Sequence, residues 1–440
     1  MKILHVFHYS NLMNGVDRTT LTLLRALRKQ GAEVFAMVPQ VGDVTAALDE
    51  LDVTYRVANL GCCTGPTQLA ELAYLSRAAM RSAVIEDWIR QERIDLVHLN
   101  TGHLLDAAIA AARAGASAVW HIHAPFEEDY RRYAGFMPPE AYAWMLEELG
   151  SHVIAVSDDV RASLLNRLPA HKVSTLYNGI DIEDLEQRAL KAEGSLREDL
   201  GLAPDTPIVL GIGRISAQKD FASFVRVASR MVASHPNVCF AIAGPAEDKA
   251  LADALQEQVV ELGLSRRVFL LGARSDAPAL LAQSDVFLST AIFEGHPLTS
   301  LEAMSLQKPV VAMDCVGLRE CIQSEVDGLL VPLGDEEACA TAVVRVLADK
   351  ALAENLGTRG RQSVAERYSA AAYASGFLKI AQRARADDRP GRNAPAASFT
   401  LGLLKEIREA HERLIKSTNT SQSMGTRLRA RLPAIFNKTR

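Results

Sequence analysis

Cysteine is scarce in this chain and follows no recognised pattern. Six cysteines occur in 440 residues: Cys62, Cys63, Cys239, Cys315, Cys321 and Cys339. Their spacing matches neither a set of metal ligands nor a disulfide framework. The sequence therefore argues against a disulfide scaffold and predicts a protein of a reducing compartment, the cytoplasm.

Long apolar runs and an excess of positive charge are also missing. The first residues, MKILHVFHYS, contain no apolar leader core and are typical of a strand that begins at residue 2. No apolar run approaches the ~20 residues that span a bilayer. The formal net charge of -5 gives no reason to expect nucleic acid as a partner. A length of 440 residues with 48% apolar content instead predicts two globular domains and an extension.

Short runs rich in β-branched residues alternate with longer helical patterns along the chain. This alternation predicts βα units whose parallel strands are buried on both faces. In the first half the expected strands are Ile3–Phe7, Val34–Val38, Val53–Val57, Leu96–Leu99, Val119–His123, Val153–Val156 and Val173–Tyr177. In the second half they are Ile208–Gly211, Val238–Ala243, Val268–Leu271, Val286–Ser289, Val310–Met313 and Leu329–Val331.

The predicted fold class is α/β, with two doubly wound, Rossmann-like domains facing each other across a cleft. We expect the first domain at residues 1–182 and the second at 207–365, joined by a polar linker at 183–206 that ends in APDTP. A helix at 366–384 should pack back toward the first domain. Residues 385–440 read as a linker followed by a basic amphipathic helical tail.

The tail leaves two interpretations open. Its last residues, TRLRARLPAIFNKTR, interleave basic and apolar side chains. Such a segment can be a peripheral foothold on anionic lipid at the inner face of a membrane. A solvated tail or a helix that docks on a partner fits equally well.

The segment FEGHPLTSLEAM is the most informative stretch of the chain. It places Glu294 and Glu302 eight residues apart, with Pro297 at the expected start of a helix. A free helix N-terminus favours phosphate, and carboxylates accept hydrogen bonds from hydroxyl groups. A ligand with a diphosphate centre and polyol ends, a nucleotide sugar, fits this combination. Paired glutamates at this spacing are also common on ordinary solvated helices.

A second run, IVLGIGRISAQKD, opens the second half of the chain. Its glycines, Gly211 and Gly213, let a ligand approach the backbone, and Arg214 and Lys219 suit a diphosphate. A dinucleotide-binding G-x-G-x-x-G motif is excluded, because Ser216 stands at the third glycine position. The alternative is a set of surface cations at a helix start.

These segments, followed by KPVVA, DCVGLREC and DGLLVP, together resemble the C-terminal domain of glycosyltransferase family 4, whose members are retaining enzymes of GT-B fold. VIAVSDDVRASLL and KVSTLYNGID are similar to the family's first domain. The resemblance extends from about Met1 to Ala381. It implies that Arg214 and Lys219 neutralise the leaving diphosphate, that Glu294 holds sugar hydroxyls, and that Glu302 holds the ribose.

Further roles follow from the same resemblance. It implies that the backbone amides of Leu298 and Thr299 bind phosphate and that Arg274 contacts the base. Glu320 would support the donor loop, although a structural ion pair is an equal alternative. His296 stands where the family often has an aromatic residue, a change that could affect sugar preference.

In the first half, WHIHAPF places His121 and His123 on the same face of a strand. The resemblance puts His123 near the anomeric carbon. A zinc site with His98 or His103 is disfavoured, because no acidic or cysteine ligand stands at a suitable spacing. A buried histidine with satisfied hydrogen bonds is the simpler interpretation of His121, which we nevertheless keep as an acceptor-side candidate.

The loop HYSNLMNGVDRTT departs from the family by having Asn14-Gly15 in place of a Gly-Gly pair. Gly15 can still donate its N–H to the diphosphate, and Arg18 is a candidate second cation. The segment PFEEDYRRYAGFMPP could cover an acceptor, with Phe126 and Tyr130 as the candidate contacts. Surface loops often have this composition.

The sequence therefore predicts a retaining glycosyltransferase that moves a sugar from a nucleoside diphosphate, UDP or GDP, to a hydroxyl of a glycan or lipid-linked acceptor. No D-x-D motif lies in a suitable loop, so no metal or other cofactor is expected. A nucleotide-sugar epimerase of the same fold and a non-catalytic nucleotide-sugar or glycan-binding scaffold are the alternatives. The oligomeric state, the sugar and the acceptor are left open.

Overall fold

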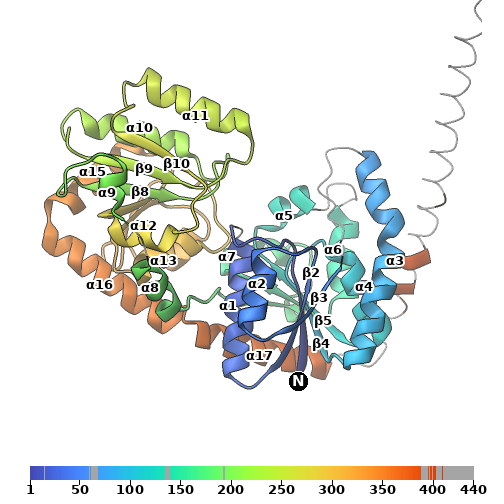
Figure 1. Ribbon diagram of the computed structural model, residues 1–440. Helices are drawn as coiled ribbons and strands as arrows, with labels where there is room; N and C mark the ends of the chain where they lie inside the picture. The colour runs from blue at the N-terminus through green and yellow to red at the C-terminus, as the bar shows by residue number, and fades with distance from the viewer. Residues whose placement is uncertain are drawn as a thin grey trace, which may run out of the picture.

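The protein has two α/β domains, each built on a parallel sheet with helices packed against it (Figure 1), as seen in a computed structural model. The structure describes residues 1–13, 15–58, 60, 68–133, 139–191, 194–387, 395, 397–398, 400–402 and 409. The predicted pair of doubly wound domains is confirmed. Most of the predicted basic tail, and Cys62 and Cys63, lie outside the described residues.

The first sheet has, among the described residues, seven strands in the order β3-β2-β1-β4-β5-β6-β7. They are β1 (Lys2–Val6), β2 (Glu33–Val38), β3 (Thr54–Val57), β4 (Leu96–Leu99), β5 (Ser117–Ile122), β6 (His152–Ala155) and β7 (Val173–Thr175). The accompanying helices are α1 (Gly15–Lys29), α2 (Asp43–Glu50), α3 (Gln68–Glu92), α4 (Leu105–Ala114), α5 (Phe126–Tyr133), α6 (Pro139–Leu149), α7 (Asp158–Leu165) and the 3-10 turn η1 (Ala170–Lys172).

The second sheet has, in the same described part of the chain, six strands in the order β10-β9-β8-β11-β12-β13. They are β8 (Ile208–Ile212), β9 (Cys239–Ala243), β10 (Val268–Gly272), β11 (Val286–Ser289), β12 (Val310–Met313) and β13 (Leu329–Val331). The helices are α8 (Ile182–Leu190), α9 (Leu196–Asp199), α10 (Phe221–Val232), α11 (Lys249–Glu261), α12 (Ala277–Gln283), α13 (Leu298–Ser305), α14 (Leu318–Cys321), α15 (Glu336–Ala348), α16 (Lys350–Arg367) and α17 (Ala370–Asp387).

Both sheets reverse their strand order once, and each reversal creates a place for a ligand. The reversal lies between β1 and β4 in the first sheet and between β8 and β11 in the second. Loops that leave neighbouring strands in opposite directions at such a point open a crevice beyond the carboxyl ends of the strands. The loops after β1, β8 and β11 contain the segments that the sequence singled out.

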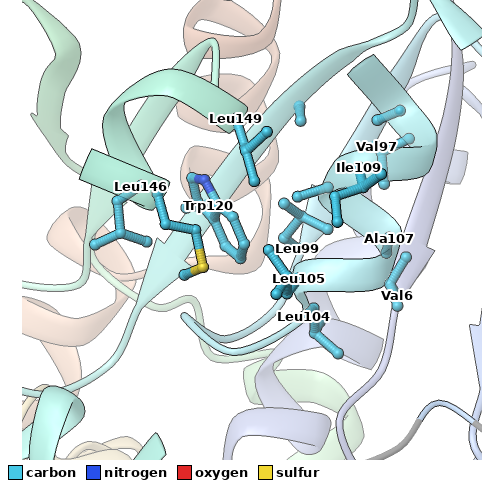
Figure 2. Close-up of a cluster of buried hydrophobic side chains, with 14 of the residues drawn as sticks. Val6, Val97, Leu99, Leu104, Leu105, Ala107, Ile109, Trp120, Leu146 and Leu149 are labelled. Carbon is cyan, nitrogen blue, oxygen red and sulfur yellow. The ribbon is translucent and has the colours of Figure 1, made fainter. Parts of the chain in front are cut away.

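The strands are rigid supports because their side chains are buried on both faces. Figure 2 shows this core in the first domain, where Trp120 of β5 lies between Leu146 and Leu149 of α6 and Leu104 and Leu105 at the start of α4. Trp120 has no exposed surface. Burying a side chain of this size contributes on the order of 2–3 kcal/mol, so β5 is firmly held.

The chain crosses between the domains twice, and the two crossings run side by side. The amide of Ile180 donates to the carbonyl of Tyr368 (2.7 Å), and the amide of Ala370 donates to the carbonyl of Ile180 (3.0 Å). After the second crossing, α17 packs against α1 of the first domain (Figure 1). Phe377 of α17 is fully buried in the first domain's core.

The segment 183–206 is not the polar linker that we expected. It forms α8 and α9, and Leu185 and Leu196 are buried in the same core as the second sheet. Asp181 caps α8 by accepting from the amide of Asp184 (3.2 Å). Two well-placed leucines and a cap are enough to fold a segment whose composition is otherwise polar.

The predicted C-terminal linker also differs, since α17 continues to Asp387. Beyond it, Ala397 and Leu401 are buried among residues of the first domain's core. Apolar residues of this segment thus return to the first domain.

No described helix is long and apolar enough to cross a membrane.

Candidate active site

Glu294 and Lys219 form an ion pair at the reversal point of the second sheet. Lys219 lies in the loop after β8, and Glu294 in the loop after β11. Gln218, which sequence reasoning missed, donates to the carbonyl of Phe293 (3.1 Å) and lies 3.4 Å from Glu294 Oε2. Glu294 is only 7% exposed, so these neighbours offset the cost of burying its carboxylate.

Gly213 serves this ion pair by leaving room for the stem of Lys219. A Cβ atom at Gly213 would lie 2.8 Å from Lys219 Cε, closer than carbon atoms normally pack. Gly213 therefore leaves space for the lysine stem, and its expected role in admitting a ligand stays a prediction. Arg214 lies apart from this pair, because its guanidinium contacts Glu247 at 3.2 Å and both side chains are about two-fifths exposed.

The N-terminal ends of α1 and α13 meet across the gap between the domains. Gly15 begins α1 and Leu298 begins α13, and a Cβ atom at Gly15 would lie 3.2 Å from Leu298 Cδ1. The first amides of a helix have no partner within that helix, and Pro297 gives α13 no side-chain cap among the described residues. The amides of Leu298 and Thr299 are therefore available to an anion.

Glu302 lies one turn into α13 and pairs with a residue of the other domain. Arg18 Nη1 of α1 lies 2.7 Å from Glu302 Oε1. The side chains are 22% and 10% exposed. Sequence reasoning named both residues but not their contact, since nothing in the sequence links positions 284 residues apart.

His123 stands directly after β5 and faces the Glu294 loop. A Cβ atom at Gly295 would lie 1.8 Å from the carbonyl oxygen of His123, so only glycine permits this approach. Burial lowers the pKa of His123 to about 3, partly offset by a hydrogen bond to the backbone of Asn100. Its Nε2 is buried without a partner among the described residues. The ring is therefore neutral, with one nitrogen available to a ligand.

His121, an acceptor-side candidate, lies inside the domain instead. It has no exposed surface, its Nδ1 is 3.1 Å from His98 Nε2, and its ring stacks on that of His123 with centroids 4.5 Å apart. His98 Nδ1 in turn lies 2.9 Å from His5 Nδ1. Burial lowers the pKa of His121 and of His98. His121 is thus placed to support His123 rather than to touch an acceptor.

The two aromatic acceptor candidates differ in position. Phe126 is 2% exposed and packs in the core with Tyr142, while Arg167 lies over its ring at 5.4 Å. Tyr130 of α5 stacks on Phe126 and is half-buried. Tyr130 is therefore the one of the two that retains surface for a ligand.

Arg274 and Glu320 have definite hydrogen-bond partners. Arg274 makes two hydrogen bonds with Asp276 (2.8 and 2.5 Å), which raise the pKa of the guanidinium. Glu320 accepts from the amides of Asp158 and Asp159 at the start of α7 (2.8 and 2.7 Å). Glu320 therefore caps a helix of the other domain, and its carboxylate forms no ion pair among the described residues. Its support of the donor loop stays a prediction.

His296 is buried against the two crossings. Its ring lies 5.4 Å from that of Tyr177 and 5.1 Å from that of Tyr368. Burial lowers its pKa to about 3. His296 thus lies between the donor loop and the two crossings.

The described residues contain no group of three or more histidine, cysteine, aspartate or glutamate side chains arranged to hold a metal ion. The four described cysteines, Cys239, Cys315, Cys321 and Cys339, are buried thiols.

Two Rossmann-like domains, with a carboxylate-lysine pair and an uncapped helix N-terminus at the strand-order reversal of the second, match the architecture of glycosyltransferases of GT-B fold. Two family models match this chain, "Glycosyl transferases group 1" over residues 193–363 and "Glycosyltransferase Family 4" over residues 13–184. With both halves matched, the chain is a family 4-type glycosyltransferase that uses a nucleotide sugar.

Individual relatives agree with the family. An Escherichia coli UDP-Gal:alpha-D-GlcNAc-diphosphoundecaprenol alpha-1,3-galactosyltransferase is 28% identical over 80% of this chain and 89% of its own. The alpha-maltose-1-phosphate synthase of Mycobacterium tuberculosis is 26% identical over 80% of this chain and 87% of its own. The fold is similar to that of Anabaena HepE in complex with UDP and glucose, with a TM-score of 0.72, 22% identity and coverage of 87% and 100%.

Proposed function

We propose that this enzyme transfers a hexosyl group from a UDP-sugar to a hydroxyl of a glycan or lipid-linked glycan, in the synthesis of a cell-surface polysaccharide or glycolipid. The observation that carries the proposal is the Glu294–Lys219 ion pair at the reversal point of the second sheet, with His123 of the first domain beside it. The Escherichia coli relative, named for UDP-Gal and a lipid-diphosphate acceptor, and the UDP-bound Anabaena structure support the donor and the acceptor class.

The donor diphosphate would lie between the start of α13 and Lys219. Lys219 and Arg214 supply positive charge, and the amides of Leu298 and Thr299 supply hydrogen bonds. Lys219 then shifts its contact from Glu294 to a phosphate oxygen, which frees Glu294 to accept from hydroxyls of the sugar. Stabilising the leaving diphosphate is the main electrostatic requirement of the reaction.

The nucleoside would extend from the diphosphate toward Glu302 and Arg274. The carboxylate of Glu302 can accept hydrogen bonds from the two ribose hydroxyls. Arg274, held by Asp276 after β10, would contact the base. These two assignments follow from the family resemblance and the positions of both residues in the second domain.

The reacting carbon would lie near His123, whose neutral ring accepts a hydrogen bond from a sugar hydroxyl. The acceptor hydroxyl attacks from the face that the diphosphate leaves, and a phosphate oxygen takes its proton as the carbon–oxygen bond to the diphosphate breaks. This course retains the anomeric configuration. Because Lys219 and Arg214 neutralise the diphosphate, we expect transfer to proceed in the presence of EDTA.

Thermal shift of the purified protein with UDP-, GDP-, ADP- and dTDP-sugars tests the donor. Specific stabilisation by a UDP-sugar that is lost in Lys219→Ala supports the proposal. Stabilisation by a GDP-sugar alone would instead identify GDP as the nucleotide of the donor. A product that forms without an acceptor would favour the epimerase. Binding without turnover with any acceptor would favour the scaffold, and NMR of the product's anomeric proton tests retention.

A further inference from the structure

Arg18 has a feature that the proposed donor site does not yet use. Its Nη1 contacts Glu302, but its Nε is buried and has no partner among the described residues. The second carboxylate oxygen of Glu302, Oε2, is likewise buried and unpartnered within that part of the chain. Buried polar atoms without partners are rare and costly, and they often mark the place of a missing ligand.

The position of Arg18 brings it to the meeting point of the two helix ends. Arg18 follows Gly15 by three residues, so it lies about 4.5 Å further along α1. Glu302 follows Leu298 by four residues, about 6 Å along α13. Since Gly15 lies beside Leu298, the first turn of α1, which carries Arg18, lies next to the first turn of α13, whose amides would hold the diphosphate.

We propose that Arg18, from the acceptor-side domain, binds the donor diphosphate and is held ready by Glu302. The proposal rests on the donor site assigned above. A guanidinium has five donors in a planar fork, so it can contact a carboxylate and a phosphate at once. The free Nε would bind a phosphate oxygen, and Glu302 Oε2 would accept from the ribose.

Charge balance supports this role. Glu294 is neutralised by Lys219 of its own domain, while Glu302 is neutralised by Arg18 of the other. A diphosphate adds negative charge beside both carboxylates, and Lys219 and Arg18 are the cations already paired with them. Because Arg18 belongs to the first domain, a bound diphosphate joins the two domains and favours the closed arrangement that transfer needs.

Binding of uridine and UDP to Arg18→Ala, measured by calorimetry, tests the proposal. Loss of a charge-assisted hydrogen bond to phosphate should weaken UDP binding about ten- to a hundred-fold and leave uridine within about two-fold. Arg18→Gln, which keeps polar atoms at the site, should show the same selective loss. The matched control is Arg25→Ala, on the same helix, whose guanidinium lies 3.2 Å from Asp184 of α8, and it should change neither ligand.

The outcomes separate the inference from the proposed function. Equal weakening of uridine and UDP in the Arg18 variants would mean that Arg18 acts only on Glu302, and it would overturn the inference. Unchanged binding of both ligands would overturn it as well. If the wild-type protein binds no nucleoside diphosphate, the proposed function fails and the inference fails with it.

Discussion

Acid should destabilise the first domain through its buried histidines, and His5 gives a quantitative test. Burial lowers the pKa of His5 to about 3, whereas the unfolded chain has the ordinary value of 6.5. The unfolded state therefore takes up a proton first as pH falls. The stability that neutral His5 contributes is complete above pH 6.5 and is lost progressively toward pH 3.

The size of the effect follows from these two values. At pH 5 the pH is 1.5 units below the pKa of 6.5 of His5 in the unfolded chain, while His5 in the folded protein is still neutral. Protonation of the unfolded chain therefore lowers the free energy of unfolding by about 2 kcal/mol. Asp17 acts in the opposite direction, because burial raises the pKa of its carboxyl group to about 8, although the nearby backbone N–H groups of Tyr9 and His8 lower it in part. Lowering the pH from 7 to 5 should therefore raise the free energy of unfolding by about 3 kcal/mol through Asp17, because only the folded state takes up a proton there.

The assay is urea unfolding at pH 7 and pH 5, followed by tryptophan fluorescence. The chain has three tryptophans, and all of them, Trp88, Trp120 and Trp144, lie in the first domain, so the signal reports on that domain. In His5→Gln the loss of stability on acidification should be about 2 kcal/mol smaller than in the wild type. In Asp17→Asn it should be about 3 kcal/mol larger.

The opposite signs make the reasoning refutable. Each variant is compared with itself at two pH values, so any general destabilisation by the substitution cancels. The same change between pH 7 and pH 5 in all three proteins would mean that His5 and Asp17 do not have the shifted pKa values.

The remaining predictions concern the cleft and the tail. Glu294→Ala should abolish transfer with an unchanged circular dichroism spectrum, and residual turnover would refute its role. Gly295→Ala should lower kcat while UDP binding stays within about two-fold, because its Cβ would push His123 away. Glu320→Ala should enlarge the radius of gyration in X-ray scattering, because it removes two hydrogen bonds that hold the second domain to the start of α7 in the first. Glu325→Ala, which breaks an exposed ion pair with Arg345 within the second domain, should leave the radius of gyration unchanged. Deleting residues 410–440 should reduce binding to anionic vesicles, and equal binding would retire the membrane role of the tail.

The sequence was sufficient for the strands and the loops that follow them. A run such as Val310–Met313 is short, rich in β-branched residues and apolar throughout, which is the pattern of a strand buried on both faces. Because parallel strands end at the same edge, the position of Lys219 and Glu294 in one crevice also followed from local pattern. The sequence misjudged α8 and α9, since isolated Leu185 and Leu196 give too weak a periodic signal.

Only the tertiary structure could decide which groups meet across the two domains. The Arg18–Glu302 ion pair and the cap of Glu320 on α7 join residues that are far apart in the sequence. A local sequence pattern does not show which distant residues will come into contact. It also decided that His121 is internal and that His296 lies against Tyr177 and Tyr368. Local periodicity fixes elements and edges, whereas pairing of charges and burial of polar rings depend on how complete elements pack together.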